Sequence, residues 1–286
     1  MFVIIGYIIV VGAILGGFLM AGGHIGVLIQ PNEVIIIFGG ALGAFVVSNN
    51  PKVLKAVFGA LMSSLKGSKY NQALYLETLT LLYRIFNKIR QNGLLSIEGD
   101  IETPDQSELF KSAPKVLADH HAVEFITDYL RLMTSGSLDV HQIDNLMDID
   151  IDIETHHEEG HLPIQALQRL ADGMPAFGIV AAVMGVVHTM ESVGLPPAEL
   201  GKLIAAALVG TFLGILVAYG FISPLAGLLE QRLAESTKYY QSIKAGLIAS
   251  INGYAPSTAV EFARKAMFSA ERPEFSELEK HLKESR

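Results

Sequence analysis

The chain has 286 residues, of which 50% are hydrophobic, and it carries a formal net charge of −8 at pH 7. This acidic balance argues against nucleic acid as a partner. The chain contains no cysteine, which excludes disulfides and suits a protein with its bulk in the cytosol. Charge is distributed unevenly, because residues 1–51 contain no lysine or arginine and a single carboxylate, Glu33.

Four segments are apolar enough to cross a membrane, which takes roughly 20 residues of helix for a hydrocarbon core about 30 Å thick. In chain order they cover about residues 2–21, 34–49, 174–190 and 203–229. The first lacks a basic start and its apolar run is too long for a signal peptide, so we expect it to be retained. The predicted fold class is an all-α integral membrane protein: four transmembrane helices with a helical cytoplasmic domain between the second and third.

Lysine and arginine predict the orientation, because they are enriched in loops that stay in the cytoplasm. The connections 22–33 and 191–201 contain neither residue, so we expect both to face outward. The charged segments and both termini are therefore expected in the cytoplasm. The predicted division of the chain is a first transmembrane hairpin (1–51), a cytoplasmic helical domain (52–173), a second transmembrane hairpin (174–229), and cytoplasmic C-terminal helices with a tail (230–286).

The charged segments have the periodicity of amphipathic helices. Apolar residues recur at helical spacing over 71–90. Residues 113–133 predict a second helix with Pro114 near its start, where proline is tolerated. Further helices are predicted over 228–251 and 257–267.

A short motif matches the HExxH pattern of zinc proteases, in which two histidines on one helix bind zinc and the glutamate acts as general base. It consists of His157, Glu158 and His161. Gly160 lies inside the pattern and no apolar helix carries it, so the sequence favours a solvated loop over a metal centre.

The acidic residues around this motif resemble the calcium loop of an EF-hand in their spacing. The sixth position of that loop must turn sharply and is nearly always glycine, whereas this chain has Ile153 there. An acidic helix or turn in which Ile149, Ile151 and Ile153 pack is the favoured interpretation. The residues in the loop pattern are Asp148, Asp150, Asp152 and Glu159.

The predicted spans contain small residues and prolines but no Asp, Glu, Lys or Arg. Proton relays through membranes generally use carboxylates or histidine, so an ion-conducting chain of this kind would take its carboxylate from another subunit. Small residues let membrane helices approach closely, and that subunit is expected to dock on three small-residue faces. These faces are Gly178/Ala182, Ala181/Gly185 and Gly210/Gly214.

Two prolines and one threonine stand out in the third and fourth spans. Pro175 predicts the first turn of the third span. The fourth span is expected to close at Pro224 or to run past it with a kink. Thr211 lies deep in the fourth span, where a threonine hydroxyl usually bonds the carbonyl four residues earlier.

Several long motifs resemble the MotA family of flagellar motor stator subunits. "PAFGIVAAVMGVVH" (175–188) and "GTFLGILVAYGFISPLA" (210–226) are similar to its third and fourth spans. Residues 68–104 and 252–279 resemble its cytoplasmic parts, and "GYIIVVGAILGGFLMAGG" (6–23) resembles its first hairpin. The resemblance covers nearly the whole chain except 135–165.

The resemblance implies a function in the bacterial inner membrane: coupling of ion flow to rotation, with no enzymatic activity and no cofactor. Several copies of the subunit would surround a MotB-type partner, whose single membrane helix supplies the ion-binding aspartate. The torque charges of the family fall on Arg90 and Glu98, which would engage the rotor protein FliG. From spacing alone they are ordinary solvated charges. The functional prolines of the family fall on Pro175 and Pro224, and its channel-side hydroxyl falls on Thr211.

The transported ion is expected to be a proton. Sodium-driven relatives carry a threonine where this chain has Ala182, which offers no side-chain oxygen to replace the water around a sodium ion. Two other functions stay open at this point. One is an ExbB/TolQ-type energiser of outer-membrane processes, which would have one span before its cytoplasmic insertion instead of two. The other, from a different class, is a membrane zinc protease that uses the HExxH motif.

Overall fold

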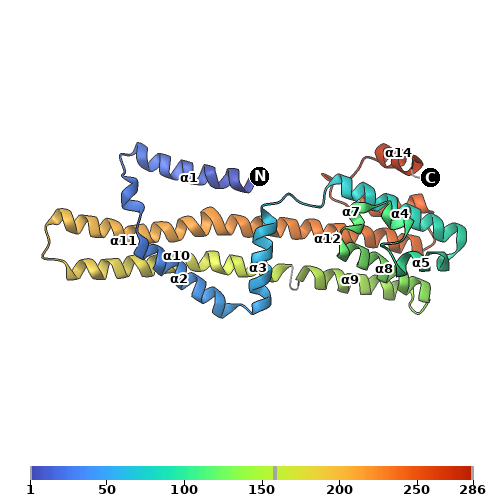
Figure 1. Cartoon of the computed structure of the whole chain (residues 1–286), viewed down its shortest axis with the longest axis horizontal. Helices are drawn as coiled ribbons and strands as arrows, with labels where there is room; N and C mark the ends of the chain where they lie inside the picture. The colour runs from blue at the N-terminus through green and yellow to red at the C-terminus, as the bar shows by residue number, and fades with distance from the viewer. Residues whose placement is uncertain (1, 157–159, 285–286) are drawn as a thin grey trace. The chain divides into compact units, whose positions relative to one another are not determined.

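In a computed structural model, residues 2–156 and 160–284 are described, and all regular structure among them is helical (Figure 1). The contacts divide the chain into two compact units. The first unit contains Met1–Gly67 and His156–Gln231, and the second contains Ser68–Thr155 and Arg232–Arg286. The boundaries between membrane and cytoplasm along the chain stay a prediction, because these units are defined by contacts.

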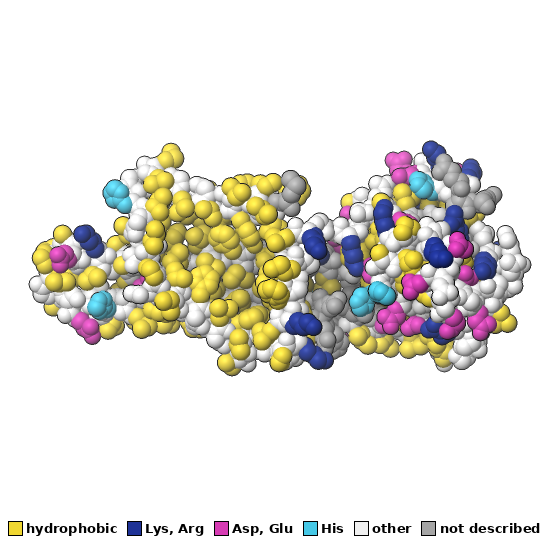
Figure 2. Space-filling view, in the orientation of Figure 1, with side chains coloured by type: hydrophobic (Ala, Val, Ile, Leu, Met, Phe, Trp, Pro, Cys, Tyr) yellow, Lys and Arg dark blue, Asp and Glu magenta, His cyan; other side chains and the backbone are white. Residues whose placement is uncertain are grey.

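In the described chain, four helices are long and apolar enough to cross a membrane. Three of them lie in the first unit, and the fourth, Pro197–Ile251, begins there and continues into the second unit. Figure 2 shows hydrophobic side chains over much of the visible face of the first unit, as expected for helices whose outer faces meet lipid. Helix α1 has no buried residue at all. The elements are α1 (Phe2–Met20), η1 (Ile25–Leu28), α2 (Pro31–Ser48), α3 (Pro51–Ser64), α10 (His161–Glu191), α11 (Pro197–Val217), the π-helical turn η3 (Ala218–Ile222) and the start of α12 (Ser223–Ile251).

Two prolines and one asparagine define where α2 and α3 begin. Pro31 opens α2 and Pro51 opens α3, at positions where the missing N–H would have no intrahelical partner. The side chain of Asn50 caps α3 by accepting a hydrogen bond of 2.8 Å from the N–H of Val53. A small core then joins α2 to the later helices, with Ile37 and Met174 among its fully buried members.

The predicted start of the third span was wrong, because Pro175 lies inside a helix and not in its first turn. Helix α10 begins at His161 and continues through Pro175 to Glu191. Its first half buries Ile164, Leu167 and Ala171, and it packs on α3 as well as on α2. Burial of this apolar face offsets the cost of the backbone hydrogen bond that proline removes.

The fourth span runs past Pro224, as one of the two predicted alternatives stated. Helix α11 ends at Val217, the five residues of η3 form a π-helical turn, and α12 continues to Ile251. Pro224 is the second residue of α12, where its missing N–H falls next to the wider turn. Such π-helical turns often mark functional positions in helices.

The second unit is a helical bundle around one core. Helix α4 (Gln72–Asn92) realises the predicted helix over 71–90 and buries Tyr75, Leu79 and Phe86. Tyr239 of α12 is fully buried, and its hydroxyl lies 2.9 Å from that of Thr78. The other elements are η2 (Leu94–Ile97), α5 (Glu98–Glu102), α6 (Glu108–Lys111), α7 (Pro114–Leu117), α8 (His120–Ser135), α9 (Val140–His156), α13 (Pro256–Lys265) and α14 (Phe275–Glu284).

The single helix predicted over 113–133 is in fact two, α7 and α8. The chain is extended at Asp119, with φ −100° and ψ 90°. This residue is buried, and its carboxylate accepts a hydrogen bond of 2.7 Å from Lys69. This long-range ion pair stabilises the break between α7 and α8. Helical periodicity within the segment does not reveal the break.

The acidic run resembling an EF-hand lies on a helix, α9, and not in a loop. Lys244 of α12 pairs with Asp148 at 2.6 Å, and the hydroxyl of Tyr129 donates to Asp150 at 3.1 Å. The favoured interpretation as an acidic helix is confirmed for Asp148, Asp150 and Asp152. Its isoleucines differ, since Ile151 is buried while the other two, Ile149 and Ile153, are more than half exposed.

Candidate functional site

Helices α10 and α11 pack backbone against backbone through their glycines. A Cβ atom placed on Gly178 would lie 2.9 Å from the carbonyl oxygen of Gly210 and 3.3 Å from the Cα of Gly214. A Cβ atom on Gly214 would lie 2.8 Å from the carbonyl oxygen of Met174. Because these neighbours are backbone atoms, a larger residue at either position would force the two helices apart.

The predicted small-residue faces are therefore used largely within the chain. Ala181 is fully buried, and a Cβ atom on Gly185 would lie 2.7 Å from the Cβ of Ala207. The expectation that these faces receive another subunit was wrong for the glycines and Ala181. It considered each helix alone, whereas the short connection after Glu191 turns α11 back along α10.

Ala182 and Thr211 flank this close contact. Each directly follows a residue buried in it, Ala181 on α10 and Gly210 on α11, and each is itself half-buried. The backbone nitrogen of Ala182 lies 3.3 Å from the position that a Cβ atom on Gly210 would take. The two residues that resemblance assigns to the ion pathway thus lie at one helix–helix junction.

Glu33 is a functional candidate that the sequence analysis passed over. Helix α2 begins at Pro31, so its first turn contains this carboxylate, which directly precedes the predicted second span over 34–49. The side chain is 7% exposed, and no hydrogen bond reaches its Oε2 atom in the described part of the chain. The sequence feature that could have indicated a role for Glu33 is its isolation, since it is the only charged side chain of residues 1–51.

The π-helical turn beside Pro224 is held by a side chain from α1. The hydroxyl of Tyr7 donates a hydrogen bond of 3.0 Å to the carbonyl oxygen of Phe221. The two rings also contact each other, with centroids 4.9 Å apart. The wider turn and the proline disturb regular helix hydrogen bonding here, and Tyr7 supplies a donor from another helix.

In the second unit, a glycine turn brings Arg90 and Glu98 to one end of helix α4. Gly93 ends α4 with φ 84°, a conformation that side chains rarely adopt. The hydroxyl of Ser96 donates to the Gly93 carbonyl at 2.6 Å and tightens the turn. Arg90 lies in the last turn of α4, and Glu98 is the first residue of α5. Each charge complements the helix dipole at its end.

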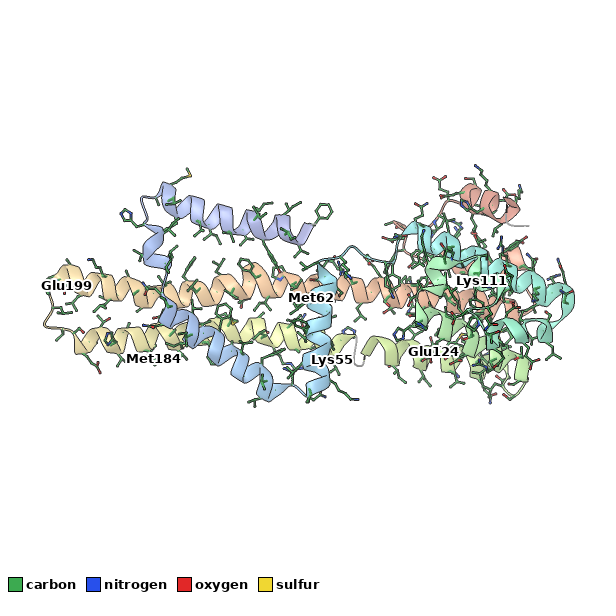
Figure 3. All side chains as sticks on the ribbon, viewed as in Figure 1. Lys55, Met62, Lys111, Glu124, Met184 and Glu199 are labelled. Carbon is green, nitrogen blue, oxygen red and sulfur yellow. The ribbon has the colours of Figure 1, made fainter. Side chains whose placement is uncertain are left out.

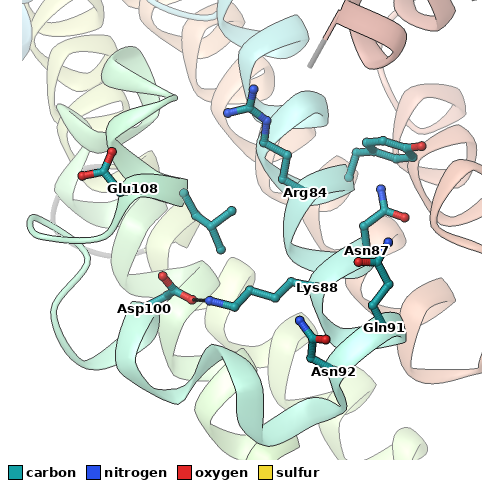
Figure 4. A pocket seen from close by; sticks show the side chains of 9 residues that line it. Arg84, Asn87, Lys88, Gln91, Asn92, Asp100 and Glu108 are labelled. Atoms are coloured by element: carbon teal, nitrogen blue, oxygen red, sulfur yellow. Dashed lines mark hydrogen bonds and ion pairs between the residues drawn. The ribbon is translucent and has the colours of Figure 1, made fainter. Parts of the chain in front are cut away.

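A cleft beside this turn is lined by polar and charged side chains, and one pair among them, Lys88 and Asp100, is in contact (Figure 4). Lys88 of α4 reaches Asp100 of α5 with a distance of 2.6 Å, and the hydroxyl of Ser107 donates to the same carboxylate at 2.6 Å. Arg90 and Glu98 do not line the cleft. Both are exposed, and no ion pair or hydrogen bond engages either side chain within residues 2–156 and 160–284. The ion pair of Lys88 and Asp100 therefore holds α4 against α5. Arg90 and Glu98 remain exposed, with no partner in the described chain.

The zinc-protease motif is not described as a whole. His157 and Glu158 lie outside the described residues, as does Glu159 of the EF-hand pattern, and His161 is the first residue of α10. Among the residues that the structure does describe, no three His, Cys, Asp or Glu side chains gather as they would around a metal ion.

Comparisons with known proteins cover both units. Residues 4–93 match the family described as Motility protein A N-terminal, and residues 118–242 match the MotA/TolQ/ExbB proton channel family. Motility protein A of Salmonella typhimurium and that of Escherichia coli are each 52% identical to this chain, over 99% of this chain and 95% of the relative. Chemotaxis protein LafT of Vibrio parahaemolyticus is 35% identical over 98% of both chains.

Two solved structures share the fold. The structure of C. jejuni MotAB matches with a TM-score of 0.77 at 20% identity and covers 96% of this chain and 98% of that chain. The flagellar MotAB stator complex from Bacillus subtilis matches with a TM-score of 0.73 at 24% identity, over 90% and 92%. The fold class predicted from the sequence, four apolar helices with a helical insertion after the second, is confirmed. From its sequence and its fold, this chain belongs to the Motility protein A family.

Proposed function

We propose that this chain is the proton-conducting stator subunit of a bacterial flagellar motor, a multi-pass protein of the inner membrane. The observation that carries the proposal is the 52% identity to Motility protein A over nearly the full chain, because it includes both candidate regions. The presence of two apolar helices, α1 and α2, before the inserted domain favours this function over the ExbB/TolQ-type energiser, which would have one.

The ion pathway is assigned to the junction of α10 and α11 with a partner subunit. A MotB-type partner with a single span would supply the ion-binding aspartate, and several copies of this chain would surround it. Thr211 and Ala182 would line the path, and Ala182 favours protons over sodium because it has no side-chain oxygen. Moving one charge through 100 mV releases about 2.3 kcal/mol, which is the energy available for each step of rotation.

Transmission to the rotor is assigned to two prolines and two charges. Pro175 and Pro224 interrupt the hydrogen bonding of the two long helices that extend from the membrane hairpin, so bending can concentrate there. Arg90 and Glu98 would push on charged residues of the rotor protein FliG. Their exposure and their lack of partners in the described chain support this role. In this orientation both termini lie in the cytoplasm.

Deletion of the gene in the source organism tests the function directly. We expect cells that build flagella but do not swim, and swimming is restored by the intact gene. Normal swimming of the deletion strain would contradict the proposal. Swimming of the rescued cells should continue in sodium-free medium and stop when a protonophore collapses the proton gradient.

Charge reversal at Arg90 or Glu98 tests their proposed contact with the rotor, in the same strain. Arg90→Glu or Glu98→Lys should lower torque while leaving the amount of protein in the membrane unchanged. Lys265→Glu is the matched control, because Lys265 is exposed in the same unit but lies on α13. Equal torque in all three variants would refute the assignment, and so would loss of assembly in the first two.

A further inference from the structure

The carboxylate of Glu33 lies in a niche that small residues of α10 and α11 leave open. A Cβ atom on Gly210 would lie 2.5 Å from its Oε2 atom, and one on Gly185 would lie 3.5 Å from its Oε1 atom. Any side chain at position 210 would therefore displace the carboxylate. The same open position also accommodates Ala181, whose Cβ would lie 3.1 Å from a Cβ atom on Gly210.

No cation neutralises Glu33 within the described chain. The side chain is 7% exposed, and its buried Oε2 has no hydrogen-bond partner. On α10, His161, Arg169 and Asp172 precede Gly185 by at least 13 residues. The titratable groups of α10 and α11 on the hairpin side of the niche are His188 and Glu191 near the end of α10, and Glu199 and Lys202 near the start of α11. All four are exposed. Along the helix axis His188 lies about 4.5 Å and Glu191 about 9 Å beyond Gly185. His188 is the nearer of the two in sequence, and its side chain is 70% exposed, whereas Glu33 is 7% exposed.

An unpaired ionised carboxylate at such a site costs several kcal/mol relative to water. A neutral carboxyl group costs much less to bury, roughly 1–3 kcal/mol when its hydrogen bond is missing. The site therefore favours the protonated side chain, and it can hold or release one proton. Membrane carboxylates with these properties mark proton paths by default.

The niche also adjoins the ion pathway assigned above. Gly210 and Ala181 line or border it, and their direct neighbours in the chain are Thr211 and Ala182. We propose that Glu33 is a proton-binding site of this chain and a relay between the outer water and the partner's carboxylate. Its place in a relay rests on the proposed stator function, whereas proton binding itself does not.

The step is a simple proton transfer. A hydronium ion gives its proton to a carboxylate oxygen of Glu33, an O–H bond forms, and a water molecule is left behind. When the proton passes to the next carboxylate, the same O–H bond breaks and Glu33 is ionised again. No oxidant, metal or further group takes part.

Infrared spectroscopy of the full chain with its single-span partner in lipid bilayers tests proton binding. We expect the absorption of protonated carboxyl groups at neutral pH to lose a component in Glu33→Gln, while any component from the partner's aspartate remains. Glu199→Gln is the matched control, because Glu199 is exposed at the hairpin end of α11 (Figure 3). An unchanged band in Glu33→Gln would overturn the proposal.

Proton flux through the complex, measured for the same variants, tests the relay. A positioned proton-transfer group contributes roughly 10²–10⁴-fold to a rate, so Glu33→Gln should lower proton flux at least about a hundredfold with normal assembly. Glu33→Asp keeps a titrating group and should retain more flux than the amide variant. Unchanged flux in Glu33→Gln would overturn the proposal. If the unaltered chain fails to restore swimming, the stator function fails instead, while the infrared band still decides whether Glu33 binds a proton.

Discussion

The close contact of α10 and α11 predicts a large difference between two glycine-to-alanine substitutions in one helix. In Gly214→Ala the new Cβ atom would lie 2.8 Å from the carbonyl oxygen of Met174 and 3.0 Å from the Cα of Gly178. Both neighbours are backbone atoms, so the helices must separate. In Gly201→Ala the new atom meets nothing within 4 Å.

The magnitude follows from two opposing effects. Overpacking costs about 1–3 kcal/mol, and replacing glycine by alanine in a helix gains about 1 kcal/mol. Gly214→Ala should therefore lower the free energy of unfolding by up to about 2 kcal/mol. Gly201→Ala should leave it unchanged or raise it by up to about 1 kcal/mol. The two variants are thus expected to differ in sign as well as in size.

Unfolding of the purified chain in lipid or mild detergent, followed by circular dichroism against added denaturing detergent, measures both variants. Swimming speed in the deletion strain provides a second measurement, and Gly214→Ala should reduce it because the ion pathway borders this contact. If Gly214→Ala unfolds at the same point as Gly201→Ala, the two helices do not pack as closely as described, and the reasoning fails.

Three further substitutions test other contacts. Lys88→Met removes the 2.6 Å ion pair with the largely buried Asp100 and should cost about 1–2 kcal/mol of stability in denaturant unfolding. A hydrogen bond from a buried arginine lowers the pKa of Glu261, so its stabilisation is present above the ordinary value of 4.5 and is lost as pH falls below it. Glu261→Gln should therefore destabilise at neutral pH and match the unaltered chain in acid. Tyr7→Phe removes the 3.0 Å hydrogen bond to the Phe221 carbonyl and should lower thermal stability in lipid by about 1 kcal/mol.

Each of these variants has a control on a comparable but exposed group. Lys111→Met breaks an exposed pair within α6, Glu279→Gln breaks an exposed pair on α14, and Tyr219→Phe alters an exposed tyrosine of η3. We expect changes within about 0.5 kcal/mol for all three. A control that destabilises as much as its partner variant would show that the named contact is not the cause.

Much of the fold could be predicted from local sequence, because hydropathy and helical periodicity act over short distances. The four apolar helices and the helix over 71–90 follow from them, and all are present. The long motifs led to the family that the full-length comparisons show. Arg90, Glu98, Pro175, Pro224, Thr211 and Ala182 were placed by resemblance alone, and their roles stay predictions.

What local sequence could not decide is which segments meet. Glu33 comes before an apolar run and would pass for the solvated end of a helix, yet contact with Gly185 and Gly210, more than 150 residues later, buries it. Likewise, local sequence does not show that Gly178 and Gly185 of α10 contact α11. Nor does it show that Lys88 pairs with Asp100 while Arg90 has no partner in the described chain. Composition and periodicity predict where the helices lie along the chain, since helix formation depends largely on neighbours in the chain. Burial and charge pairing depend on distant segments, and only the tertiary structure brings those together.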